Sequence, residues 1–124
     1  MIPTKTILVV EDDLDLCKAM ERTLQAERYK TVGTNTFREA MIKLKNQNFS
    51  CVLLDLRLGE EKGEDLIEFM RSRPDVLSKD SPVVLISGHL EADIVSELKD
   101  KIKGALVKPF DMKSLVSAVK KAAL

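Results

Sequence analysis

Short apolar runs alternate along the chain with longer stretches in which apolar residues recur every three or four positions. The short runs have the length and the β-branched content of buried strands, and the longer stretches have the period of amphipathic helices. We predict strands over residues 6–10, 30–34, 51–54, 83–87 and 105–107. We predict helices over about residues 14–27, 63–73, 91–101 and 112–122, with a further helix that begins near Thr36.

Polar residues mark where several of these helices begin and end. Thr36 and Glu39 have the spacing of a capping box, in which the two residues bond each other's backbone N–H. Pro74 ends the third helix because proline lacks the N–H that a helix interior needs. Asp111 is a favourable N-cap for the last helix. These boundaries give five consecutive strand–helix units without a domain linker.

Five such units with continuously apolar strands predict an α/β fold, a doubly wound, five-stranded parallel sheet covered by helices on both faces. We expect the flavodoxin-like (βα)5 arrangement with strand order 2-1-3-4-5. The length of 124 residues fits a single domain, which we assign to residues 1–124. In sheets of this kind the ligand site lies beyond the carboxyl ends of the strands, so the residues after each strand are the ones to inspect.

The composition excludes some classes of protein. Lys and Arg number 20, as do Asp and Glu, and the zero net charge argues against a nucleic-acid binder with a broad basic face. The apolar runs are far shorter than the roughly 20 residues that span a bilayer, and the N-terminal segment lacks a signal-peptide layout. Cys17 and Cys51 have no metal-ligand spacing, so we interpret them as buried, reduced thiols of a cytoplasmic protein.

Charged or reactive residues follow four of the five predicted strands. They are Glu11-Asp12-Asp13, Asp55, Ser87-Gly88 and Lys108-Pro109. Because neighbouring parallel strands end at the same edge of a sheet, we expect these groups to converge. Each pair of carboxylates at about 5 Å would repel by about 3 kcal/mol at an effective dielectric of about 20, so the site needs counter-charges. Lys108 supplies one, and Mg²⁺ suits the remainder because it prefers oxygen ligands in open sites.

A phosphoryl group on Asp55 would meet a complete set of stabilising groups at this edge. The cation, the Lys108 ammonium, the Ser87 hydroxyl and nearby backbone amides would face its oxygens. A carboxylate is a known nucleophile for forming aspartyl-phosphate. The residues therefore favour phosphoryl transfer to Asp55. Asp13 is instead interpreted as a helix-start carboxylate.

Four segments at these strand ends resemble the signature segments of receiver domains of two-component response regulators. They are Ile7-Leu8-Val9-Val10-Glu11-Asp12-Asp13, Leu53-Leu54-Asp55-Leu56-Arg57-Leu58, Pro82-Val83-Val84-Leu85-Ile86-Ser87-Gly88 and Val107-Lys108-Pro109-Phe110. Each segment alone is a weak signal, but the four in this order and spacing are specific. The resemblance covers the whole chain.

The resemblance implies a role for each matching residue. Asp55 would accept a phosphoryl group from a sensor histidine kinase or a histidine phosphotransfer protein. The implied Mg²⁺ ligands are Glu11, Asp12, Asp55 and the backbone carbonyl of Arg57. The implied phosphoryl-binding and switch residues are Ser87, Gly88 and Lys108. The peptide before Pro109 would be cis, and Arg57 and His89 would tune access to the site.

The resemblance further implies a phosphorylation-activated switch that catalyses its own phosphoryl transfer and slow dephosphorylation but is not otherwise an enzyme. Its output surface would be the fourth helix, the fifth strand and the fifth helix, which would contact an output domain, an effector or a second copy of the chain. Direct contact of this domain with nucleic acid or a membrane is not expected.

Three positions depart from the family pattern. Glu11 replaces the commoner aspartate, Gly59 stands where many members have proline, and Ala105 stands where an aromatic residue is usual. The aromatic residue normally moves inward when the hydroxyl moves. Because Ala105 cannot do so, we expect the signal to leave through residues 87–90 and the fourth helix.

Three alternative functions remain to be compared with the switch. A degenerate receiver that is never phosphorylated would be favoured by the alanine at position 105, although it would be expected to lack acidic residues or the lysine. A flavodoxin would need a phosphate-binding loop after the first strand, where Glu11-Asp12-Asp13 would repel phosphate. An aspartate-based phosphatase would carry its nucleophile on the first strand.

Overall fold

A computed structural model describes residues 4–88 and 91–124. Five parallel strands form its main sheet in the order β2-β1-β3-β6-β7. Their bounds are β1 Thr6–Val10, β2 Lys30–Thr34, β3 Cys51–Asp55, β6 Val83–Ser87 and β7 Gly104–Val107. Since β6 and β7 are the fourth and fifth strands of this sheet, the predicted order 2-1-3-4-5 and the doubly wound α/β fold are confirmed.

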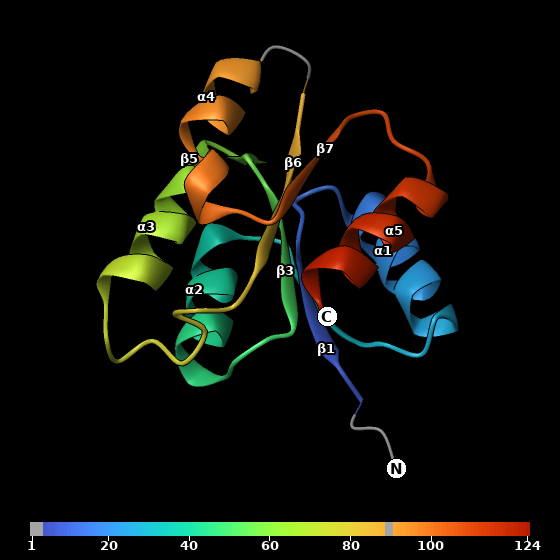
Figure 1. The fold of residues 1–124 in the computed structure, drawn as a ribbon, viewed down its shortest axis with the longest axis horizontal. Helices are drawn as coiled ribbons and strands as arrows, with labels where there is room; N and C mark the ends of the chain where they lie inside the picture. The colour runs from blue at the N-terminus through green and yellow to red at the C-terminus, as the bar shows by residue number, and fades with distance from the viewer. Residues whose placement is uncertain (1–3, 89–90) are drawn as a thin grey trace.

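Helices cover both faces of the sheet (Figure 1). On one face lie α1 (Leu14–Ala26) and α5 (Met112–Ala122), and on the other lie α2 (Phe37–Asn46), α3 (Glu64–Ser72) and α4 (Ala92–Glu97). Within residues 4–88 and 91–124 there is no helix with the length and apolar character that crossing a bilayer requires.

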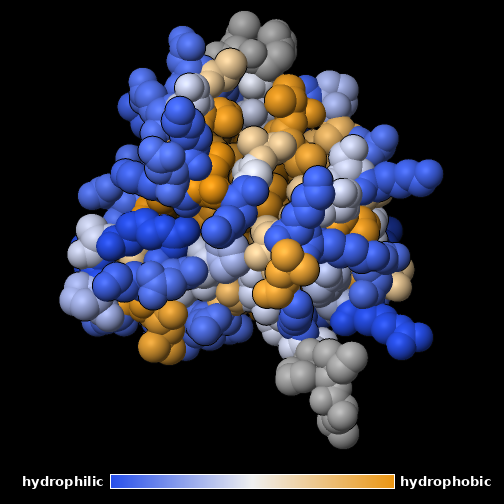
Figure 2. Space-filling model, viewed as in Figure 1, coloured by the Kyte–Doolittle hydropathy of each residue, from blue (hydrophilic) through white to orange (hydrophobic). Residues whose placement is uncertain are grey.

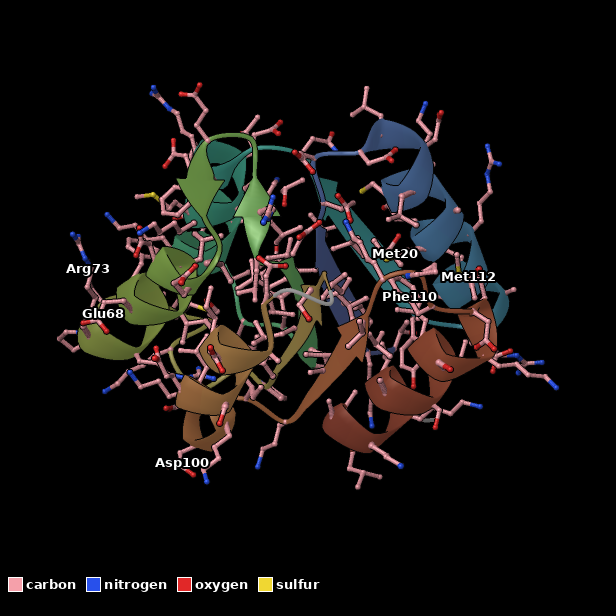
Figure 3. The ribbon with its side chains drawn as sticks, turned by 90° about the horizontal axis from the view of Figure 1, so that it is seen from above. Met20, Glu68, Arg73, Asp100, Phe110 and Met112 are labelled. Atoms are coloured by element: carbon pink, nitrogen blue, oxygen red, sulfur yellow. The ribbon has the colours of Figure 1, made fainter. Side chains whose placement is uncertain are left out.

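Each face of the sheet has its own buried cluster, because side chains alternate between the faces along a strand. Leu53 of β3 belongs to the cluster under α1 and α5, and the next residue, Leu54, belongs to the cluster under α2 and α3. Figure 3 shows Met20 of α1 close to Phe110 and Met112 at the beginning of α5. The two clusters anchor the strands from both sides and so fix the positions of the strand ends.

The predicted helix caps are present. Asp13 caps α1 by accepting a hydrogen bond from the N–H of Leu16, and Asp111 caps α5 by accepting one from Ser114. Thr36 caps α2 by accepting one from the N–H of Glu39 at 3.1 Å. The other half of the predicted capping box differs, because Glu39 Oε1 accepts from the N–H of Asn35 at 3.0 Å and not from that of Thr36. The helix-start role assigned to Asp13 therefore agrees with its geometry.

The fourth helix is shorter than predicted. It was expected over 91–101, but α4 ends at Glu97 and a separate 3-10 turn, η2, covers Lys99–Lys101. The N–H of Leu98 lies 3.1 Å from both the Ile94 and the Val95 carbonyls, which tightens the helix end. The apolar residues of this segment are only partly buried, so packing does not hold the chain in a longer helix.

A short hairpin follows β3 and was not predicted. It pairs β4 (Arg57–Leu58) with β5 (Glu61–Lys62) in an antiparallel register. Gly63 comes next and passes so close to β3 that a Cβ atom there would lie 2.2 Å from the backbone oxygen of Asp55. Only glycine allows that approach. Strands of two residues carry no readable periodicity, which explains why the sequence did not reveal the hairpin.

Candidate functional site

The strand register brings the candidate residues to one edge of the sheet. Val10 pairs with Leu54, so Glu11 follows β1 at the level of Asp55. Asp55 pairs with Ile86, the residue before Ser87. Ser87 in turn pairs with Val107, the residue before Lys108. The predicted convergence of these four strand ends is thus observed.

Lys108 links two of the carboxylates. Its Nζ lies 2.6 Å from Asp55 Oδ2 and 3.0 Å from Glu11 Oε1. The Asp55 and Glu11 side chains are 4% and 0% exposed, whereas that of Lys108 is 34% exposed. Burial lowers the pKa of Lys108, but its bonds to Asp55 and Glu11 outweigh burial and hold the pKa above its usual value. The Lys108–Pro109 peptide is cis, as the family resemblance implies.

Glu11 is a buried carboxylate whose pKa is strongly raised. Burial, followed by the neighbouring Asp55, raises this pKa from 4.5 to about 8 against the opposing effects of the Asp13 N–H and Lys108. Its Oε2 accepts a hydrogen bond from the Asp13 N–H at 3.1 Å. Its Oε1 lies near Lys108 but has no hydrogen-bond partner within the described part of the chain. This oxygen therefore interacts with the Lys108 ammonium as an ion pair and not through a hydrogen bond.

Asp12 is in a different situation from Glu11. It is exposed, and its Oδ2 accepts a hydrogen bond from the Gly59 N–H at 3.0 Å. Burial raises its pKa, but the bond from Gly59, further hydrogen bonds and the charge of Lys108 together leave that pKa below its usual value. The two acidic residues after β1 therefore differ in environment, with the pKa of Glu11 raised mainly by burial and that of Asp12 lowered by hydrogen bonds.

The acidic residues form a group that suits a hard divalent cation. Glu11, Asp12 and Asp55 each offer a carboxylate oxygen, and these oxygens lie within 4.8 Å of one another. Carboxylate oxygens are the ligands that Mg²⁺ prefers, and Glu11 Oε1 forms an ion pair with Lys108 but accepts no hydrogen bond from the described residues. The N–H of Arg57 donates to Asp55 Oδ1 at 2.9 Å, so the Arg57 backbone adjoins this group. The ligand role of its carbonyl stays a prediction.

Glu91, the residue before α4, contacts the end of β6, and the sequence analysis missed this contact. The N–H of Gly88 donates to Glu91 Oε1 at 2.6 Å, and Arg57 Nε lies 3.5 Å from Glu91 Oε2. Glu91 is buried, while the Arg57 side chain is 75% exposed. The only signal for this contact was the three-residue spacing from Gly88 to Glu91, which is the spacing of a capping box. His89, predicted to tune access, lies outside the described residues.

Ala105 borders a hollow between α4 and β7. The hollow has a volume of about 260 Å³. Its lining residues are Ser87, Gly88, Ala92, Val95, Ser96, Ala105 and Val107. Figure 2 shows apolar residues open to the surface in this region, bordered by hydrophilic ones. The small side chain at position 105 thus leaves space directly beside Ser87.

Comparisons with known proteins agree with this geometry. The sequence profile of the response regulator receiver domain matches residues 7–120. The chain is 28% identical over 118 residues to the acid tolerance regulatory protein ActR of Sinorhizobium medicae (strain WSM419), covering 94% of the chain and 59% of ActR. It is 28% identical over 117 residues to the transcriptional regulatory protein ZraR of Escherichia coli (strain K12), covering 94% of the chain and 26% of ZraR. The chain therefore spans only part of the length of both relatives.

Solved structures share the fold. The chemotaxis response regulator CheY4 of Vibrio cholerae superimposes with a TM-score of 0.85 at 21% identity, covering 97% of this chain and 99% of that one. A CheY-like receiver domain from Methylobacillus flagellatus gives a TM-score of 0.83 at 22% identity, with the same coverage. With a family profile that extends over nearly the whole chain and a fold that agrees with it, we conclude that this protein belongs to the response regulator receiver domain family.

Proposed function

We propose that the chain is a phosphorylation switch in which Asp55 accepts a phosphoryl group from a sensor histidine kinase or a histidine phosphotransfer protein. The environment of Asp55 carries the proposal. Its carboxylate ends a buried strand, with the Arg57 N–H 2.9 Å from Oδ1 and Lys108 Nζ 2.6 Å from Oδ2. Both oxygens are thereby oriented, and a carboxylate held in this way can serve as a nucleophile.

In the transfer, a carboxylate oxygen of Asp55 forms a bond to phosphorus as the bond between phosphorus and the donor's histidine nitrogen breaks. The electron pair of that bond remains on the imidazole nitrogen. Lys108, which neutralises Asp55 beforehand, then pairs with the phosphoryl oxygens. We assign the Ser87 hydroxyl and the Gly88 N–H as further donors to these oxygens.

Glu11, Asp12, Asp55 and the Arg57 carbonyl are the residues that would hold Mg²⁺. When bound, the cation supplies positive charge that offsets both the carboxylate repulsion and the charge of the phosphoryl oxygens. The grouping of the carboxylate oxygens within 4.8 Å supports this assignment.

Hydrolysis ends the signal. Water attacks phosphorus, the bond between phosphorus and the Asp55 oxygen breaks, and inorganic phosphate leaves a free carboxylate. Arg57 and His89 are the residues that we propose to tune the access of this water. The exposed Arg57 side chain beside the site supports its part in the proposal.

We propose that the phosphorylated domain acts through the surface of α4, β7 and α5 on an output domain, an effector or a second copy of the chain. ActR and ZraR are regulatory proteins by name and extend beyond the matched region, which supports such an output. We assign residues 1–124 to one receiver domain. A cytoplasmic location is supported by the free, buried thiols of Cys17 and Cys51.

Mass spectrometry tests the phosphoacceptor. Incubation with Mg²⁺ and acetyl phosphate should add one phosphoryl group that hydroxylamine removes. Asp55→Asn should abolish the gain, whereas Asp75→Asn, at an exposed position outside the site, should leave it unchanged. Phosphorylation of Asp55→Asn at the parent's yield would refute the assignment. No mass gain in the parent would favour the phosphorylation-independent interaction module.

A further inference from the structure

We propose that Glu91 sets the affinity of the site for a phosphoryl group by competing with that group for the N–H of Gly88. This inference rests on the proposed function, because it concerns the phosphoryl group on Asp55. Gly88 follows Ser87 directly at the end of β6, and its N–H donates to Glu91 Oε1 at 2.6 Å. The donor assigned to the phosphoryl group is thus already bonded to a buried carboxylate.

The hydrogen bond from the Gly88 N–H to the Glu91 carboxylate is short and has a charged acceptor. A hydrogen bond to an ionised acceptor is roughly twice as strong as one between neutral groups. The Gly88 carbonyl also accepts a hydrogen bond from the Glu91 N–H at 3.1 Å, so the two residues are joined in both directions. The bond from the Gly88 N–H to the Glu91 carboxylate matches one half of a capping box, in which a glutamate accepts from the N–H three residues earlier. Glu91, the residue before α4, therefore occupies the N–H that is assigned to the phosphoryl site.

Arg57 connects Glu91 to the phosphoacceptor. Its backbone N–H donates to Asp55 Oδ1 at 2.9 Å, and its side-chain Nε lies 3.5 Å from Glu91 Oε2. The Arg57 side chain is largely exposed, so this ion pair adds little stability. The Arg57 side chain can nevertheless still pair with the Glu91 carboxylate after that carboxylate has lost its hydrogen bond from the Gly88 N–H.

Binding of a phosphoryl group disturbs this arrangement in a defined way. Its oxygens repel the Glu91 carboxylate and take the Gly88 N–H, so the hydrogen bond at the entrance to α4 is lost. None of the residues described from Ala92 to Glu97 is buried, and weakly packed elements are the first to rearrange. Glu91 is thus a positioning residue that couples phosphorylation of Asp55 to a rearrangement of α4. This coupling does not need an aromatic side chain at position 105.

The isosteric variant Glu91→Gln tests the competition. It removes the charge and keeps the size of the side chain and an acceptor oxygen. Calorimetric titration with beryllofluoride, a phosphoryl mimic, in the presence of Mg²⁺ should show affinity about tenfold tighter than in the parent. Asp93→Asn removes one charge from the exposed side of the first turn of α4 and should leave the affinity within about twofold of the parent's. Equal affinities in Glu91→Gln and the parent would overturn the proposal.

Amide exchange at Gly88 provides a readout that general loss of stability would not reproduce. In the unphosphorylated Glu91→Ala variant the Gly88 amide should exchange at least tenfold faster than in the parent, while amides in the core of β3 keep the parent's rates. With beryllofluoride bound, the Gly88 amide should be protected equally in both proteins. Equal exchange at Gly88 in the unphosphorylated proteins would overturn the proposal. A parent that neither binds beryllofluoride nor gains a phosphoryl group would overturn the proposed function, and this inference with it.

Discussion

Gly59 donates its backbone N–H to the carboxylate of Asp12 at 3.0 Å, so the turn of the hairpin after β3 holds the acidic residue after β1. Gly59 has a φ of 62°, a conformation that proline, with φ near −65°, cannot adopt. Proline also lacks the N–H. The residue that many family members carry at this position is therefore incompatible with the contact that this chain makes.

Gly59→Pro should accordingly release Asp12. We expect the pKa of Asp12 to rise toward its ordinary value, because the Gly59 N–H is a main cause of its depression. NMR titration of the carboxyl group measures this change. Gly59→Ala keeps the N–H and costs only about 1–2 kcal/mol of backbone strain, so its Asp12 pKa should match the parent's. An unchanged pKa in Gly59→Pro would contradict the role of this hydrogen bond.

The stability of the metal-free protein should fall as the pH rises from about 5 to about 8. Glu11 titrates at about 8 in the folded chain and at 4.5 ordinarily, so the folded state holds an extra proton between these values. The resulting stabilisation is complete below pH 4.5 and is lost as the pH passes 8. Urea unfolding in the presence of a chelator measures it. In Glu11→Gln this pH dependence should disappear. If the free energy of unfolding changed with pH in the same way in both proteins, Glu11 would not be its cause.

Lys108→Met should destabilise the metal-free protein by about 2 kcal/mol, because Asp55 and Glu11 lose the ammonium that pairs with both. The control Lys103→Met removes an exposed lysine before β7 and should change the free energy of unfolding by less than about 0.5 kcal/mol. Lys108→Met should still accept some phosphate from acetyl phosphate but should show no change in amide exchange across α4. A parent-like exchange response in this variant would exclude Lys108 from the switch.

Ala105→Phe should stabilise the protein by about 1 kcal/mol, because an aromatic ring at this position can enter the apolar hollow of about 260 Å³ beside α4. Urea unfolding provides the measurement. Ala105→Ser supplies a matched variant of similar size that cannot fill the hollow and should not gain stability. If both variants behave alike, the hollow does not accept the ring.

The main sheet and the position of the site could be predicted because both follow from long patterns. Each strand that carries a candidate residue is a continuous apolar run, and Asp55, Ser87 and Lys108 end or follow such runs. Parallel pairing then determines that these ends meet. No knowledge of individual side-chain contacts was needed for that conclusion.

The contacts of Gly59 and Glu91 could not be predicted in the same way. The first depends on a single positive φ, and the second on a carboxylate turning back to an N–H three residues earlier. Hairpin strands of two residues likewise leave no periodic signal. The apolar spacing predicted the fourth helix but not its end at Glu97, where its apolar residues are only partly buried. Local geometry, and not hydrophobic pattern, decides these features.

The assembly of the site from separate strands also has a consequence for folding. Asp55 and Lys108 are 53 residues apart in the chain, and Lys108 follows β7, which lies at the edge of the sheet. Contacts between such distant residues form late, because closing the intervening chain costs entropy. A folding intermediate with β1 and β3 paired but β7 not yet docked would hold the nucleophile without its cation. Because Lys108 is needed for the switch and not for all phosphate uptake, the response of α4 to phosphorylation would appear only after the last strand has docked, and partly folded chains would not signal.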